Sequence, residues 1–247
     1  MNTRLMNLYG GLLLSTLVAM CGCNTNGDRV FTGETREESR TVEQGAAQFV
    51  RINLSMKAGE LKVAGGAPQL LDADFTYNVP EWKPEVKYQV SGGVGSLAVE
   101  QPGSGSASGN TKNVWDLHVN NKTPMEMTVN MGAGRAALTL SGLTLTRLEL
   151  NMGAGEITVD LTGNWKKDVS AQIHGGVGRA TVRLPKDVGV HVVAHGGLGS
   201  INANGFIKQG DAYVNDQYGK SPVTLQIEVE GGVGEINLEL GGEPPAA

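Results

Sequence analysis

A short Gly-x-Gly segment recurs along the chain, and each copy lies between two runs of alternating apolar and polar residues. The clearest copy is LELNMGAGEITVDL, residues 148–161. Alternation with a period of two predicts a β-strand with one buried face. Glycine between two such runs permits a sharp bend, because it readily adopts positive φ. The second glycines of the seven copies are Gly59, Gly95, Gly134, Gly155, Gly178, Gly199 and Gly234.

The spacing of the copies predicts how the strands are arranged. Four consecutive copies, from Gly134 to Gly199, lie 21, 23 and 21 residues apart. A nearly fixed period in strand-forming sequence is typical of a solenoid, in which each repeat is one coil and neighbouring coils stack. We therefore predict an all-β fold, specifically a β-solenoid built from roughly 21-residue Gly-turn repeats.

Stacked coils would place equivalent polar residues side by side in ladders. After the turn, Arg135, Glu156 and Arg179 would alternate in charge on successive strands and fix their register. Before the turn, two histidines on adjacent coils leave two interpretations open, an exposed metal site or a hydrogen-bonded polar ladder, and we favour the ladder. The members of this second ladder are Asn130, Asn151, His174, His195 and Glu230.

The same glycines are also compatible in principle with a phosphate-binding turn. A dinucleotide site needs a strand, a Gly-rich turn and then a helix, whereas here every turn is followed by a strand-type run such as EITVDL. The sequence has no nucleophile elbow, Walker loop or His-Glu-x-x-His motif, and its carboxylates are scattered. We predict no catalytic residue, cofactor or metal. The alternative is a carbohydrate-active β-helix enzyme acting on envelope or capsular polysaccharide.

The first 23 residues have one early positive charge and an apolar core that is too short to span a bilayer. This pattern predicts a signal peptide. Both cysteines of the chain lie at its end, and the segment resembles the lipobox of bacterial lipoproteins. Gly22 precedes Cys23, whereas the bulky Met20 precedes Cys21. We therefore predict acylation at Cys23 in preference to Cys21.

Three segments read as irregular structure. Residues 24–45 are polar and charged without apolar periodicity, which predicts a flexible tether. Residues 102–113 are rich in Gly and Ser and predict a loop or linker. Residues 242–247 are expected to form a disordered tail.

A longer insertion, residues 204–222, separates the last two glycine turns and contains three aromatic residues. Aromatic side chains on a projecting loop are a candidate contact for a partner. The alternative, which we favour, is an irregular end coil whose aromatic residues cap the core. These residues are Phe206, Tyr213 and Tyr218.

The segments KAGELKV, LLDADFTYN, PEWKPEV and GGVGSLAVEQ all lie within residues 46–101. They resemble the N-terminal toast-rack domain of bacterial envelope proteins. Residues 114–241 resemble the LiaF-like C-terminal β-solenoid and the related adhesin repeat domains. The resemblance implies a β-solenoid outside the cytoplasmic membrane with no known chemistry. LiaF-type proteins inhibit a two-component sensor but have transmembrane helices before the solenoid, so we do not transfer that activity.

The net charge of −5 and the absence of a Lys/Arg-rich run argue against nucleic acid as a partner. We predict a non-catalytic envelope lipoprotein that serves as a binding or scaffold module in adhesion or envelope stress sensing. Its expected partners are the membrane, through the acyl anchor, and an envelope protein or glycan. We expect a location at the outer membrane or cell surface, with the fold facing the periplasm or exterior. In a Gram-negative cell, Asn24 after the proposed anchor favours the outer membrane.

Overall fold

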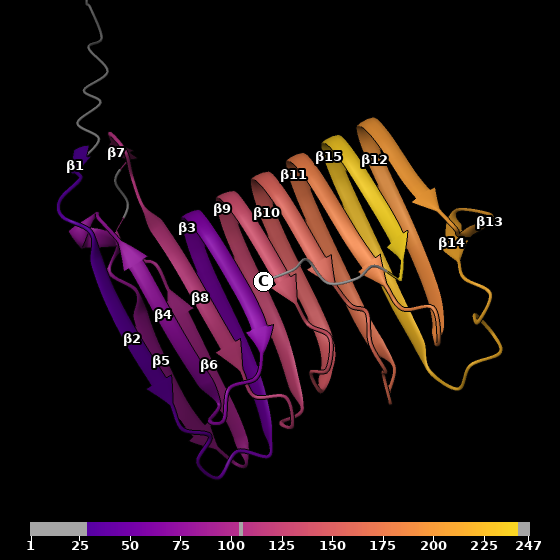
Figure 1. Cartoon of the computed structure of the whole chain (residues 1–247), viewed down its shortest axis with the longest axis horizontal. Helices are drawn as coiled ribbons and strands as arrows, with labels where there is room; N and C mark the ends of the chain where they lie inside the picture. Colours follow the sequence, from indigo (N-terminus) through magenta and orange to yellow (C-terminus); the bar gives the residue numbers. More distant parts are fainter. Residues whose placement is uncertain (1–28, 104–105, 242–247) are drawn as a thin grey trace, which may run out of the picture.

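The structure, a computed structural model, describes residues 29–103 and 106–241, and it consists almost entirely of β-strands (Figure 1). The predicted signal peptide, Cys21, Cys23 and the tail at residues 242–247 lie outside the described residues. The long strands are β3 (Phe49–Gly65), β9 (Met125–Thr139), β10 (Leu145–Asp160), β11 (Val169–Leu184), β12 (Gly189–Asn204) and β15 (Thr224–Leu240). The shorter elements are β1 (Arg29–Phe31), β2 (Arg36–Val42), β4 (Leu71–Tyr77), the 3-10 turn η1 (Pro80–Trp82), β5 (Glu85–Ser91), β6 (Val94–Glu100), β7 (Ser106–Ser108), β8 (Asn113–Val119), β13 (Ile207–Gln209) and β14 (Ala212–Val214).

The six long strands fold over at their glycines, so that each contributes one half to each of two layers (Figure 1). In β10 the buried side chains before the turn include Leu148 and Leu150, and those after it include Ile157 and Val159. The buried positions thus change from even to odd at the turn, which keeps the apolar side of both halves facing the same interior. The hydrophobic core lies between the layers.

The long strands pair in parallel in the order β3, β9, β10, β11, β15, β12. The glycines of neighbouring strands are in register, for example Gly155 with Gly134 and with Gly178. Stacking in chain order, as expected from the repeats, holds from β9 to β11 and then fails. The C-terminal strand β15 lies between β11 and β12, and β12 becomes the last long strand of the stack.

The copy of the motif at Gly95 does not form a corner. Gly92 and Gly93 have φ of 58° and 80° and make a two-residue turn between β5 and β6, which pair antiparallel. Tandem glycines with positive φ are typical of a tight hairpin, so the chain reverses there instead of bending. Gly95 therefore lies inside β6 and pairs with Val50 in the first half of β3.

The two blocks separated in the sequence analysis, residues 46–101 and 114–241, share one sheet and one core. In the 13-stranded sheet, β3 of the first block pairs with β9 of the second along most of its length. One cluster of buried side chains runs from Ala47 to Leu238. The N-terminal block therefore continues the stack, because its first long strand joins the same parallel ladder.

The prediction of a flexible tether at residues 24–45 is wrong where the structure describes this segment, because β1 and β2 both lie in it. β2 pairs antiparallel with β4, and β1 pairs with β7. Side-chain hydrogen bonds from Ser39 to Asp74 (2.5 Å) and from Thr41 to Asp72 (2.8 Å) reinforce the β2–β4 pairing. The side chains of β2 are mostly exposed on both faces, so its sequence has no apolar alternation to reveal the strand.

Candidate functional site

Six of the predicted turn glycines form the line of corners along the stack. Their φ values lie between 129° and 150°, a region that L-residues with a side chain rarely adopt. A Cβ on Gly155 would collide with the carbonyl oxygen of Gly134 on the adjacent strand. Each of these corners is followed by strand in the described residues, which gives the glycines a structural role. They are Gly59, Gly134, Gly155, Gly178, Gly199 and Gly234.

A shallow groove crosses the outer face of the first layer just before the corners. Its volume is about 720 Å³, and it extends over β3, β9, β10, β11 and β15. The polar ladder predicted from the sequence forms much of its lining. The polar lining residues include Ser55, Asn130, Asn151, His174 and Glu230.

Neighbouring members of this ladder contact each other across the strands. The Asn151 amide Nδ2 donates to Oδ1 of Asn130 at 3.1 Å, and Nδ1 of His174 lies 3.0 Å from Oε2 of Glu230. Because β15 is inserted between β11 and β12, Glu230 lies between His174 and His195 and the two histidines are not adjacent. Within the described residues, no three His, Cys, Asp or Glu side chains are placed to hold a metal ion.

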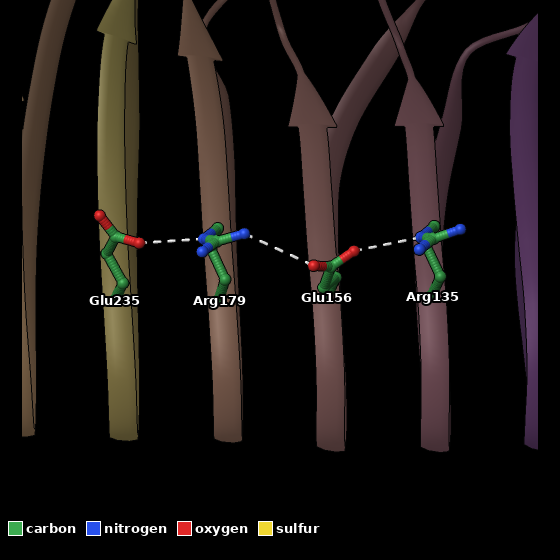
Figure 2. Close-up of polar contacts among 4 residues, drawn as sticks. All are labelled: Arg135, Glu156, Arg179 and Glu235. Atoms are coloured by element: carbon green, nitrogen blue, oxygen red, sulfur yellow. Dashed lines mark hydrogen bonds and ion pairs between the residues drawn. The ribbon is translucent and has the colours of Figure 1, made fainter.

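A second ladder follows the corners on the other layer (Figure 2). Nε of Arg135 lies 3.2 Å from Glu156, whose other oxygen lies 3.5 Å from Arg179. Arg179 also donates through Nε to Glu235 at 2.9 Å. This bond and the charges of Glu235 and Glu156 raise the pKa of Arg179. Stacking in chain order predicts Ser200 beside Arg179, but Glu235 lies there instead, because β15 is inserted between β11 and β12.

The three aromatic residues of the insertion at residues 204–222 differ in burial, which bears on whether they cap the core or are free to contact a partner. Phe206 and Tyr213 are half-buried and pack against the main core, as expected of capping residues. Tyr218 is 39% exposed, and its ring centroid lies 5.2 Å from that of His191. Of the three, Tyr218 is the one whose side chain is exposed.

Two buried polar residues that the sequence analysis missed complete the corner of β3. β6 ends before this corner and β8 begins after it, so none of the strands that the structure describes covers the corner on that side. Oε1 of Gln101 accepts the backbone N–H groups of Lys57 (2.9 Å) and Ala58 (3.3 Å). Nδ2 of Asn113 donates to the Ala58 carbonyl at 2.7 Å. These side chains replace the missing strand, because buried backbone groups require partners.

Comparison with protein families identifies the type of fold. The family model described as the N-terminal domain of toast_rack, DUF2154, matches residues 31–183, which is more than half of the chain. The chain belongs to the toast-rack family. The match crosses residues 102–113, which were predicted to form a loop or linker but contain the short strand β7 and the start of β8. It includes the strands on both sides of this segment, in agreement with the single shared core.

A solved structure from Clostridium sporogenes is similar over most of the chain. That protein, described as a "putative cell adhesion protein", is 40% identical, with a TM-score of 0.82 over 84% of this chain and 100% of its own. Two proteins described as "putative adhesins" match more distantly. The one from Bacteroides fragilis is 8% identical (TM-score 0.33, 85% and 99% coverage), and the one from Parabacteroides merdae is 14% identical (0.25, 85% and 99%). The last two TM-scores are too low to carry an argument. No curated protein sequence matches the chain.

Proposed function

We propose that this toast-rack protein is a non-catalytic adhesion module, displayed outside the cytoplasmic membrane, whose polar groove binds an extended polar ligand such as a glycan. The proposal rests mainly on the groove, which crosses five parallel strands. The repeats form a β-solenoid-like stack that presents similar side chains at each step, about 4.8 Å apart. The description of the 40% identical relative as a "putative cell adhesion protein" supports this role.

The chemistry of the groove suits binding. Asn130, Asn151 and Ser55 offer neutral donors and acceptors, which match the hydroxyl groups of a sugar chain. The side-chain amides of Asn151 and Asn130 hydrogen-bond to each other. A bound ligand would replace such bonds with its own, so each strand would contribute only modestly to the affinity. Many weak contacts along one line favour long polymers over small molecules.

A hydrolytic role would need a second carboxylate. Glycosidases of the common type use two carboxyl groups that flank the scissile bond. Among the described residues that line the groove, Glu230 is the one carboxylate, and it contacts His174. This composition favours binding over turnover.

The proposed role of the groove in ligand binding is tested by replacing both Asn151 and His174 with alanine. We expect the full chain to bind one or more members of a panel of immobilised envelope and host polysaccharides. Loss of two hydrogen-bonding groups should weaken that binding by about fivefold or more. The matched control replaces Thr158 and Thr181, which neighbour each other on the outer side of the same strands after the corner. Equal loss in both variants, or release of glycan fragments by the unmodified chain, would refute the proposal.

The membrane anchor is proposed at Cys23. Within residues 29–103 and 106–241, no helix has the length and apolar character required to cross a membrane. We expect Cys23→Ser to shift the exported chain from the membrane fraction to the aqueous fraction, because the acylated thiol is lost. Cys21→Ser is the matched control and should leave the chain with the membranes. Membrane association that survives Cys23→Ser would exclude this anchor.

A further inference from the structure

Three aliphatic side chains are exposed at the corners of β11, β15 and β12, the last long strands of the stack. Val177 is 56% exposed, Val233 is 47% exposed and Leu198 is 73% exposed. Val177 pairs with Val233, which pairs with Leu198, so the three residues are neighbours in one row. We call this row the aliphatic crest. Single exposed apolar residues are ordinary on a protein surface, whereas a contiguous set is a candidate contact surface.

The crest is confined to one end of the stack. The residue before the corner glycine is alanine in β3, β9 and β10, whereas it is valine or leucine in β11, β15 and β12. The corners of these last three strands read GGVG, GGVG and GGLG, with no polar or charged side chain. The charged residues that follow two of them, Arg179 and Glu235, hydrogen-bond to each other at 2.9 Å. The crest can therefore enter an apolar environment without carrying an unpaired charge into it.

The chain enters the fold on the same side of the stack as the corners (Figure 1). Asn113 donates to the Ala58 carbonyl at the corner of β3. Asn113 also pairs with Tyr77, which pairs with Arg36, the first residue of β2. β1 precedes β2 and lies on this side as well, where Phe31 is 75% exposed. The start of the described chain and the crest thus share one side, opposite the loops that connect the long strands.

The acyl anchor proposed at Cys23 would hold this side of the stack near a bilayer. Residues 24–28 separate Cys23 from Arg29, the first described residue. A peptide of this length spans at most about 20 Å, even when it is fully extended. The side that carries Phe31 and the crest would therefore remain within reach of the lipid surface. Apolar side chains of proteins held at a membrane insert at the boundary between headgroups and acyl chains.

We propose that the aliphatic crest contacts the lipid bilayer to which the chain is anchored, with Val177, Val233 and Leu198 inserted at this boundary. The contact is favourable because it removes apolar surface from water. The anchor holds one end of the stack and the crest holds the other, so the row of corners lies along the membrane surface. The inference rests on the anchor proposed at Cys23, and it does not depend on the ligand proposed for the groove.

The contact is measured on the full acylated chain in vesicles of phosphatidylethanolamine and phosphatidylglycerol whose acyl chains carry bromine, a short-range quencher of fluorescence. A fluorophore is attached at Ala154→Cys, because Ala154 is exposed at the corner of β10 and pairs with Val177. The matched label is at Tyr218→Cys, on the exposed residue that lies beside His191, away from the corners. We expect bromine to quench the label at Ala154 and to leave the label at Tyr218 unquenched. The chain without an added cysteine accounts for labelling at other positions.

A second variant removes the apolar character of the crest while keeping its shape. It combines Val177→Thr, Val233→Thr and Leu198→Thr, because threonine resembles valine in shape but carries a hydroxyl group that is costly to bury without a partner. Quenching of the Ala154 label should fall to the level seen at Tyr218. Association with the vesicles should stay unchanged, because the acyl anchor supplies it. Circular dichroism establishes that each variant is folded.

Flotation of the vesicles separates this inference from the anchor itself. A chain that floats with the vesicles but whose Ala154 label is not quenched would overturn the crest contact and leave the anchor standing. Quenching that persists in the threonine variant would do the same. A chain that does not float would overturn both. A blue shift of the Ala154 label that grows with the number of chains per vesicle and does not respond to bromine would place a second copy at the crest, which also overturns contact with lipid.

Discussion

At the level of single residues, two separate constraints fix the corner glycines. Positive φ alone disfavours a side chain, and the close approach of the next strand excludes a Cβ by contact. The sequence indicated these corners correctly at six of seven positions. It failed at Gly95 because the letters GGVG occur both there and at Gly178. Pairing with β5 decides that the copy at Gly95 is a hairpin, and that pairing is not encoded in four residues.

Gly155→Ala should destabilise the fold by roughly 3 kcal/mol or more, because it combines backbone strain with a collision against the Gly134 carbonyl. The measurement is urea unfolding of the full chain. Gly66→Ala is the control, since Gly66 has φ of 113° but open space around its Cβ position. Gly66→Ala should show only the strain, about 1–3 kcal/mol. Equal losses in both variants would mean that strand contact does not constrain the corner.

At the level of strands, the position of β15 follows from its carboxylates. Four glutamates of β15 each contact a polar or charged side chain on β11, whereas the paired positions on β12 are Val193, His195, Ser200 and Asn204. The alternation of positive and negative side chains across neighbouring strands can be recognised in the sequence only if the order of the strands is already known. The pairs on β11 and β15 are Gln172–Glu228, His174–Glu230, Arg179–Glu235 and Arg183–Glu239.

The edge strand β2 should loosen in acid. Glu38 accepts hydrogen bonds from Lys83 and Tyr77, each at 2.7 Å, and these bonds hold the pKa of Glu38 below its ordinary value of 4.5. A lowered folded-state pKa gives stabilisation that is present above pH 4.5 and is lost as the pH falls through the folded-state value. Hydrogen exchange of the β2 amides should therefore accelerate over this acidic range.

Two variants separate this effect from general acid unfolding. Glu38→Gln should flatten the pH dependence of exchange in β2, because the titrating carboxylate is gone. Glu37→Gln, on the neighbouring exposed residue, should leave it unchanged. A pH profile that persists in Glu38→Gln would assign the acid sensitivity to another group.

For the whole molecule, periodicity predicted the β class, and the resemblance predicted the toast-rack family. Its organisation as one core was not predicted, because the Gly/Ser-rich loop resembles a domain linker while the pairing of β3 with β9 is a long-range contact. The same long-range contacts place the groove on one face and leave the edge of β12 at the end remote from β1 (Figure 1).

The groove crosses from β11 directly onto β15, so the strand order β11, β15, β12 is the central claim. It is tested by crosslinking cysteine pairs in the full chain with a short thiol-reactive reagent. Arg179→Cys with Glu235→Cys should crosslink within one chain, because these strands are neighbours about 4.8 Å apart. Arg179→Cys with Ser200→Cys should not, because β15 separates those residues by about two strand spacings, roughly 9.6 Å. Efficient crosslinking of the second pair and failure of the first would contradict the account.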